Sequence, residues 1–287
     1  ANTFRDAGNF DQATQWYERA DTLLSGRRYL RFRAMLKNYV AELLLQHGDD
    51  PLAVLEESMT LRRELKDSIP MADLWILMGH RYRQRYQLDE AERYYERARA
   101  AAPGDLIIES NYKEGMGEVA FIRGNFELSM ENLMEALEFH RGYGYQYPLA
   151  RLLHRLGEVF EEEGYYDLAT KYLLQARDIA TRCGYTLVIA DVYYQLGWVS
   201  FRSKNLEVAE QNVHSAKASY DNLRIVRRQA SCLSLMGHIH FQRQAYDSSQ
   251  YYHTQSLRLR EDIGDRKGVS FSLSNLGNLY LNQRQYA

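Results

Sequence analysis

The sequence predicts an all-α fold in which antiparallel helix pairs stack one on the next. Three observations carry this prediction: a glycine that recurs at a nearly constant interval, small residues at fixed offsets from it, and further glycines that separate the helices. Composition agrees, because hydrophobic residues make up 45% of the chain and Pro occurs only 4 times. Such a chain is expected to fold and to be rich in helix.

A large apolar residue followed by glycine marks the first helix of each pair. The steps between successive glycines are equal, except for a slightly shorter first step. The period is roughly 40 residues, and a fixed period of this size is the signature of a repeat architecture. The markers are Met78-Gly79, Met116-Gly117, Leu156-Gly157, Leu196-Gly197, Met236-Gly237 and Leu276-Gly277.

Small residues mark the second helix of each pair. One stands at the same offset after each of the first five glycines, and another stands at the seventh position beyond it. An offset of seven is two helical turns, so both lie on one face of a helix and let the paired backbones approach closely. The first series is Ala91, Ser129, Ala169, Ala209 and Ser249, and the second is Ala98, Ala136, Ala176, Ala216 and Ser256.

Two further sets of glycines predict where the helices end. Glycine ends helices because it adopts the left-handed conformation without a steric penalty. Between the helices of one pair stand Gly48, Gly124 and Gly164, and after the second helix stand Gly104, Gly144, Gly184 and Gly264, with Arg224 in the corresponding place of one repeat. Both sets predict the same helix boundaries.

These motifs resemble the tetratricopeptide repeat family across essentially the whole chain. One matching segment runs from Leu156-Gly157 through Gly164-Tyr165 to Ala176, and another runs from Gly8-Asn9-Phe10 to Ala20. The resemblance implies a right-handed superhelical solenoid. The common repeat has about 34 residues, and the longer spacing here resembles the long-helix variants of kinesin light chains, Pins/LGN-type adaptors and bacterial signalling regulators.

Taken in order, the elements form one array over residues 1–287. Residues 1–26 are the end of one pair, six complete pairs fill about 27–264, and residues 265–287 are the first helix of another. The pair at 27–66 departs from the pattern. There Pro51 starts the second helix, Ala41 and Ala53 are taken as the small residues, and Glu57 replaces a large apolar residue. Because a solenoid normally ends in a polar capping helix, we expect a fragment of a longer protein.

Charge and composition argue against several kinds of partner. The net charge is -2 and no long run of Lys or Arg occurs, so nucleic acid is not expected. No apolar stretch reaches the ~18 residues that span a bilayer, and the first residues do not resemble a secretion signal. Cys183 and Cys232 lie far apart without metal-ligand spacing. We expect no membrane contact, no disulfide or zinc site, and a cytoplasmic location.

The sequence predicts no catalytic residue, cofactor or metal site. His238 and His240 are about 200° apart around a helix, so they cannot bind one ion together, and we expect one packed and one solvated ring. The acidic run 161–163 is interpreted as a solvated helix end. Gly142-Tyr143-Gly144 is interpreted as a turn between repeats, because the strand and third glycine of a dinucleotide loop are missing.

The resemblance implies that first helices line a concave groove, which gives a candidate binding site. Trp198 is its strongest member, because the equivalent residues in the other repeats are polar and Trp is enriched at binding hot spots. Phe201 recurs in register with Phe121 and Phe241 and either contacts a partner or packs between helices. The candidate residues are the acidic Glu114, Glu118, Glu158 and Glu162 (with Glu161 beside them), the aromatic Tyr194, Trp198 and Phe201, and the amides Asn275 and Asn278.

The predicted function is polypeptide binding by a scaffold or sensor segment. Asn275 and Asn278 resemble the asparagines with which Pins/LGN-type adaptors and kinesin light chains hold an extended peptide, since an amide both donates and accepts hydrogen bonds. The acidic and aromatic residues imply a partner with basic and apolar residues. The Lys and Asn pattern of chaperone-binding members is absent, so no heat-shock chaperone is expected. The alternative is a regulatory arm of a bacterial signalling protein or ATP-driven transcription regulator, which senses a ligand or positions another domain of the same chain.

Overall fold

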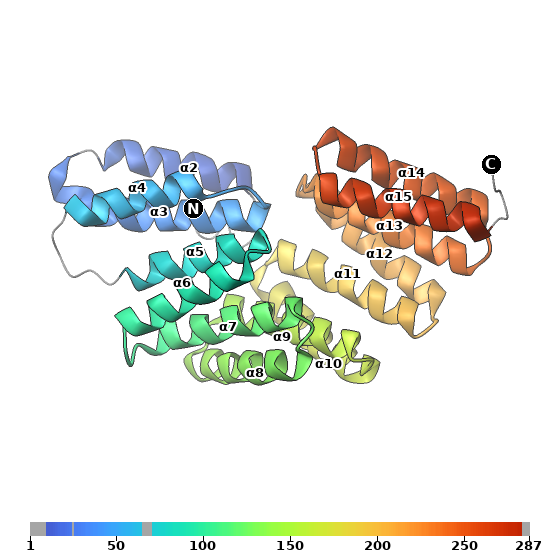
Figure 1. Cartoon of the computed structure of the whole chain (residues 1–287), viewed down its shortest axis with the longest axis horizontal. Coiled ribbons are helices and arrows are strands. Elements are labelled where there is room, and N and C mark those ends of the chain that lie inside the picture. The colour runs from blue at the N-terminus through green and yellow to red at the C-terminus, as the bar shows by residue number, and fades with distance from the viewer. Residues whose placement is uncertain (1–9, 25, 65–70, 283–287) are drawn as a thin grey trace. The chain divides into compact units, whose positions relative to one another are not determined.

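The computed structural model describes residues 10–24, 26–64 and 71–282. Within these ranges the regular structure is helical, and no strand occurs. The chain divides into two compact units, Ala1–Val159 and Phe160–Ala287, and each unit is a run of helices (Figure 1). The all-α prediction is confirmed, whereas one continuous array over the whole chain stays a prediction.

Unit 1 consists of helix pairs in chain order. The short 3-10 helix η1 (Arg27–Tyr29) precedes its first complete pair. Its α-helices are α2 (Phe10–Leu23), α3 (Leu30–His47), α4 (Leu52–Glu64), α5 (Ala72–Gln84), α6 (Leu88–Ala101), α7 (Leu106–Ile122), α8 (Phe126–Tyr143) and most of α9 (Gln146–Glu162). Gly8, Asn9, Tyr286 and Ala287 of the predicted terminal repeats lie outside the described residues.

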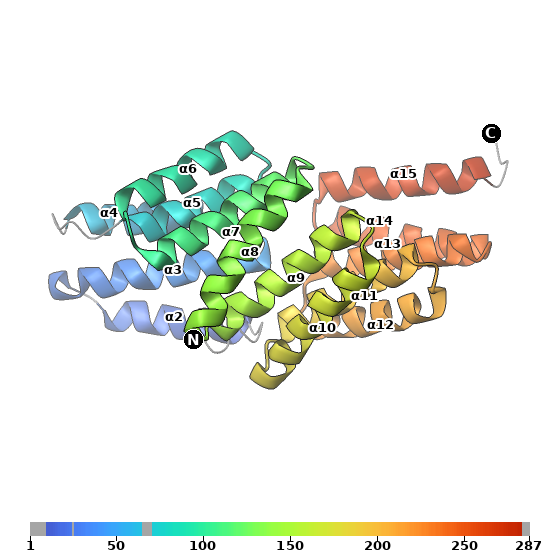
Figure 2. The ribbon, with the colours of Figure 1, turned by 90° about the horizontal axis from the view of Figure 1, so that it is seen from below.

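Unit 2 continues the same pattern. Its α-helices are α10 (Tyr166–Cys183), α11 (Thr186–Arg202), α12 (Leu206–Asn222), α13 (Val226–Gln242), α14 (Tyr246–Asp262) and α15 (Arg266–Asn282). The second helices α8, α10, α12 and α14 begin at equal intervals along the chain, as the sequence pattern predicts. Consecutive helices of unit 2 contact one another, and both views show α11, α12 and α13 together (Figure 1, Figure 2).

The turns between helices lie at the glycines that were predicted to end them. The backbone is left-handed at all seven predicted glycines, with φ of 71° at Gly144 and 82° at Gly164, and also at Arg224 with φ of 56°. Lys204 and Gln244 take the same conformation at the place that Gly164 occupies in its pair. A side chain in this conformation costs roughly 1–2 kcal/mol. The stacked helices therefore impose the turn even where glycine is missing.

The marker glycines lie where two helices approach most closely. A Cβ atom added to Gly117 would lie 2.8 Å from Leu133 Cγ, and one added to Gly197 would lie 2.7 Å from Val213 Cγ2. The predicted small residues are buried in the same contacts, and Ala209 and Ala216 are fully buried. A side chain at either glycine would force α7 from α8, or α11 from α12.

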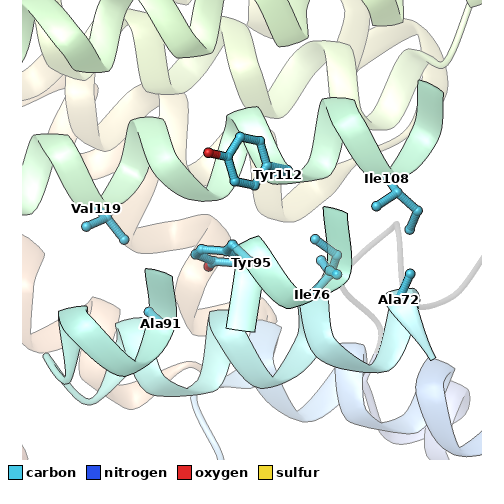
Figure 3. Close-up of a cluster of buried hydrophobic side chains, with 8 residues drawn as sticks. Ala72, Ile76, Ala91, Tyr95, Ile108, Tyr112 and Val119 are labelled. Atoms are coloured by element: carbon cyan, nitrogen blue, oxygen red, sulfur yellow. The ribbon is translucent and has the colours of Figure 1, made fainter. Parts of the chain in front are cut away.

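Tyr95 occupies the centre of one core cluster in unit 1 (Figure 3). Its ring packs against two glycines, because a Cβ on Gly79 of α5 or on Gly115 of α7 would lie within 2.4 Å or 2.5 Å of it. Its hydroxyl lies 3.0 Å from Nδ1 of His80. Burial raises the pKa of Tyr95 to about 12 and lowers the pKa of His80 well below its usual range. A neutral phenol and a neutral imidazole therefore share this hydrogen bond.

The pair at 27–66 forms as predicted, but its register is different. Ala53 is exposed and Leu55 is fully buried, so the assignment of Ala53 as the packed small residue is wrong. The reason is that the buried face of α4 carries Leu55 and Ser58, and Ser58 Oγ donates to the Ala34 carbonyl oxygen of α3 at 3.1 Å. Glu57 faces α3 instead of the core, with its carboxylate 3.0 Å from Lys37 Nζ and 3.6 Å from Arg33 Nη2.

No helix in the described ranges is both long and apolar enough to cross a membrane. Cys183 is exposed and Cys232 is buried, and both are free thiols. Burial raises the pKa of Cys232 to about 12, so this thiol stays protonated.

Candidate functional site

The residues that directly follow the marker glycines form a row on each unit. We call the side that carries this row the first-helix face. Two unit 2 members touch, since α11 contacts α13 and the rings of Trp198 and His238 are 5.9 Å apart. The row consists of His80, Glu118 and Glu158 in unit 1, and of Trp198, His238 and Asn278 in unit 2.

Glu118 is a buried carboxylate that links three helices of unit 1. Only 4% of it is exposed. Nε of Arg155 on α9 donates to its Oε1 at 2.9 Å, and Arg83 on α5 pairs with its Oε2. A carboxylate with two guanidinium partners is compensated despite its burial. Glu118 therefore faces its own chain and is not presented to solvent.

Glu114 is arranged in the same way one turn earlier on α7. It is also 4% exposed and pairs with Arg151 of α9, whose side chain is 38% exposed. The guanidinium thus forms the outer layer and the carboxylate the inner one. We expected Glu114 and Glu118 to present carboxylates in the groove, and the structure places both beneath arginines.

Glu158 is the more accessible carboxylate of this row. Its side chain is 18% exposed and pairs with Arg155, and His154 Nε2 lies 3.8 Å from its Oε1. Arg155 thus joins Glu118 and Glu158. The structure brings these two predicted residues together through an arginine.

The acidic run 161–163 was interpreted as a solvated helix end, and for its first residue this interpretation is wrong. Glu161 is 2% exposed, because its side chain faces α11. There Gln195 Nε2 donates to its Oε2 at 3.1 Å, and Arg202 pairs with its Oε1. Glu162 is more accessible, and both of its carboxylate oxygens accept hydrogen bonds from Arg202 Nη2, at 3.2 Å and 3.1 Å.

The predicted aromatic residues of unit 2 form a cluster. Trp198 and Phe201 meet edge to face, with centroids 5.7 Å apart and planes at 85°. Phe201 also lies 6.3 Å from the His238 ring. Such contacts are worth about 0.5–1.5 kcal/mol each beyond area burial. Burial raises the pKa of Tyr194, and a hydrogen bond from Trp198 acts in the opposite direction. Tyr194, Trp198 and Phe201 are half-buried, so part of the cluster faces solvent.

The recurring phenylalanines differ in what they contact. Phe121 packs against Phe126 at 5.6 Å and Phe241 against Tyr246 at 5.8 Å, in each case within one helix pair. Packing between helices therefore explains these two. Phe201 instead contacts Trp198 on its own helix and His238 on α13.

The two histidines of α13 face different neighbours. His238 contacts His253 at 5.0 Å, whereas His240 stacks on Tyr252 at 5.1 Å and lies 3.7 Å from Glu210. Across the described part of the chain, no three His, Cys, Asp or Glu side chains are arranged to hold a metal ion.

The two asparagines of α15 differ in their hydrogen bonds. Asn275 is half-buried, and its Nδ2 donates to Ser234 Oγ on α13 at 3.1 Å. Asn278 is exposed, and its backbone carbonyl accepts a hydrogen bond from Asn282 Nδ2 at 2.8 Å. Among the described residues, the Asn278 amide side chain has no protein partner.

Three arginines of the site were missed by sequence reasoning: Arg151, Arg155 and Arg202. A signal was present, since Arg151 and Arg155 each follow their carboxylate partner by 37 residues, and Arg202 follows Glu162 by 40. Opposite charges about one repeat apart lie on neighbouring first helices. They predict an ion pair across the stack.

Comparison with known families gives one match. Residues 150–181, which cover most of α9 and most of α10, match the tetratricopeptide repeat. No curated protein matches the sequence.

Solved structures share the fold at low identity. The Rap protein complexed with Competence and Sporulation Factor has a TM-score of 0.72 at 15% identity, over 97% of this chain and 85% of that chain. The STAND protein PH0952 from Pyrococcus horikoshii, which has a tetratricopeptide repeat sensor, has a TM-score of 0.61 at 17% identity, over 91% of this chain and 44% of that chain. The APC/C hetero-tetramer Cut9-Hcn1 gives 0.57 at 17%, over 93% of this chain and 53% of that one.

The match at 150–181 is flanked on both sides by helix pairs with the same glycine and small-residue pattern. The solved structures add agreement of the fold. Residues 150–181 therefore match the tetratricopeptide repeat, and the fold of the chain agrees with that of a solved protein that has a tetratricopeptide repeat sensor.

Proposed function

We propose that this chain binds a polypeptide on its first-helix faces and does not itself catalyse a reaction. Stacked helix pairs create extended surfaces that suit polypeptide binding. A similarly folded Rap protein was solved in complex with Competence and Sporulation Factor. The step from fold to function is an analogy, so the proposal depends on the side chains of the face.

The observation that carries the proposal is the half-exposed Trp198. The same position holds His, Glu or Asn in the other marked repeats. Its ring is held by Phe201 and by His238. An aromatic side chain that is already fixed loses little conformational freedom on binding, and tryptophan is enriched at binding hot spots. Trp198 is therefore suited to receive a large apolar side chain of a partner.

The asparagines suggest how the partner backbone is held in unit 2. Asn278 offers a donor and an acceptor that no described residue uses. Asn275 donates to Ser234, which leaves its side-chain oxygen as an acceptor for a backbone N–H. An extended peptide beside α15 would use both.

The carboxylates of the first-helix faces contribute unequally to the proposed binding of a polypeptide. We propose that basic residues of the partner meet Glu158 on unit 1 and Glu162 on unit 2, whose side chains are 18% and 38% exposed. Glu114 and Glu118 act indirectly, because they hold Arg151, Arg155 and Arg83 in place. Exposed charges mainly speed association, and their effect weakens at high salt.

The test uses peptides selected from a displayed random library against the parent chain. Truncation of a buried tryptophan anchor typically costs about 2 kcal/mol or more, which is roughly a thirtyfold loss of affinity. We expect Trp198→Ala to weaken the selected peptides by at least this factor in isothermal titration calorimetry. Its helical circular dichroism should be unchanged, because the ring is only half-buried.

Trp16→Ala is the matched control, since Trp16 is 48% exposed on α2 of unit 1. It should bind the peptides like the parent chain. Equal affinity of the parent and Trp198→Ala would show that the first-helix face of unit 2 is not the binding surface.

A second candidate is a sensor segment of a larger regulatory protein. The similar fold of the STAND protein with a tetratricopeptide repeat sensor favours it. Under this alternative, a small ligand would raise the melting temperature of the chain and no peptide from the library would bind.

A further inference from the structure

A cleft of about 740 Å³ lies in unit 1, lined by α4, α5 and α6. Its residues Met78 and Tyr82 of α5 are on the helix face opposite His80 and Arg83, so the cleft is separate from the first-helix face. Volumes of roughly 300–1,000 Å³ are typical of small-molecule sites. The size of the cleft therefore suits a small molecule.

The lining residues of α4 and of α5 recur at intervals of three or four, which is the spacing of one helix face, and α6 contributes Tyr94. The lining residues of α4 lie on a different face from its buried residues Leu55 and Ser58, and Ser58 Oγ donates to the Ala34 carbonyl oxygen of α3 at 3.1 Å.

The inner surface of the cleft is apolar and aromatic. Met78 is buried, and Leu52 and Met59 are half-buried. The rings of Tyr82 and Tyr94 stack at 5.1 Å with planes at 11°. Methionine adapts its shape to what it contacts, and its sulfur interacts favourably with aromatic rings. This surface fits the apolar or aromatic body of a ligand.

Arg63 supplies a positive charge at the end of α4. Its Nη2 lies 3.2 Å from Met59 Sδ, which holds the guanidinium against the apolar surface. In the described ranges Arg63 has no carboxylate partner. The other two lining arginines differ, because both pair with Asp50, with Arg81 Nε donating to Oδ1 at 2.8 Å. Arg63 is thus the lining cation whose charge is not neutralised.

The distribution of charge favours an anion beside Arg63. Glu56 is the acidic group of the lining, and it lies two helical turns before Arg63. With Asp50 included, three arginines face two carboxylates, which leaves an excess of one positive charge. A ligand carboxylate at Arg63 would form charge-assisted, bidentate hydrogen bonds.

We propose that this cleft binds a small carboxylic acid with an apolar or aromatic body. The body lies on Met59, Met78 and Tyr82, and the carboxylate pairs with the guanidinium of Arg63. This site is independent of polypeptide binding by Trp198. Either proposal can therefore fail without the other.

The test uses protein with ¹³C-labelled methionine methyl groups, titrated with 4-phenylbutyrate and with its uncharged analogue 4-phenylbutanamide. Substitution of each methionine by leucine assigns the signals of Met59 and Met78. We expect saturable shifts of these two signals with the acid. The amide should bind at least tenfold more weakly, because it cannot form the ion pair with Arg63.

Two arginine variants test whether Arg63 is the residue that pairs with the carboxylate of the ligand. Arg63→Gln should bind the acid and the amide about equally. Arg93→Gln should keep the preference for the acid, because Arg93 is an exposed residue of α6 that pairs with Glu90 and does not line the cleft. The proposal is overturned if millimolar acid gives no saturable shift, if the parent binds acid and amide alike, or if the shifts centre on Met130 and Met236.

Discussion

His253 fills a space that leucine or valine fills in other pairs. Its imidazole lies against Gly237, as Leu133 lies against Gly117 and Val213 against Gly197. It is 2% exposed, and its Nδ1 has no hydrogen-bond partner among the described residues. Burial lowers the pKa of His253 to about 4, and the positive charges of His238 and Arg260 act in the same direction. The ring is therefore neutral at pH 7.

This histidine predicts a loss of stability in mild acid. The folded-state pKa of about 4 lies below the ordinary value of 6.5, so the unfolded chain binds more protons between these pH values. The contribution is complete above pH 6.5 and is lost as pH falls toward 4, by about 2 kcal/mol at pH 5. His253→Leu should lose less stability than the parent between pH 7 and pH 5 in urea unfolding followed by circular dichroism. Identical losses would contradict the assignment.

Single residues also show what the sequence could and could not predict. The left-handed glycines were predictable, because glycine favours that backbone conformation by itself. Lys204 and Gln244 were not, because neither residue favours it, and the packed helices on each side impose it. The burial of Glu161 was likewise hidden, since Arg202 and Gln195 come from the next first helix.

Between elements, the ion pairs of Glu118 connect the first helices of unit 1. Arg83 belongs to α5, Glu118 to α7 and Arg155 to α9. Removal of one partner from a buried ion pair leaves an uncompensated charge and typically costs about 3–5 kcal/mol. The carboxylate of Glu118 has two such partners.

Glu118→Gln should therefore lower the free energy of unfolding by about 3 kcal/mol, although glutamine has nearly the same shape. Glu135→Gln is the control on α8, since Glu135 is 52% exposed and pairs with Lys113 at 3.0 Å. Exposed pairs contribute about 0–1 kcal/mol. Urea unfolding of the two variants measures the difference, and equally small effects would mean that the Glu118 network does not support the stack.

The pair α3–α4 shows the limit of pattern matching at the scale of an element. The existence of two helices was predictable from Gly48 and Pro51. The register of α4 was not, because the offset from Ala41 points to Ala53, whereas the buried small residue of this helix is Ser58.

At the scale of the molecule, the repeat was predictable because the same pattern of glycines and small residues recurs several times along the chain. The polar network of the first-helix face was harder to predict. Its ion pairs between helices join residues about one repeat apart, and such pairs become visible only when the repeats are aligned. From the sequence, each side chain was placed by the position of its residue on its own helix. Whether the side chain is buried depends also on the next helix, which this placement did not consider.

Repeat proteins are stabilised mainly by contacts between neighbouring repeats. A destabilising substitution should therefore affect the neighbouring repeats more than distant ones. In Gly197→Leu, the new side chain would meet Val213 at the closest approach of α11 and α12. Overpacking of this kind costs about 1–3 kcal/mol. We expect that loss in urea unfolding. Protection of backbone amides in hydrogen exchange should fall most in α11, α12 and α13.

Gly277→Leu is the matched control, because no described atom lies within 4 Å of a Cβ at this position of α15. The residue is exposed in the helix, and leucine is a better helix former than glycine by roughly 0.8 kcal/mol, so stability should be unchanged or slightly higher. Equal destabilisation by both variants would show that close packing is not the role of the marker glycine. A uniform loss of protection from α5 to α14 in Gly197→Leu would show that the repeats unfold together, which nearest-neighbour stabilisation does not allow.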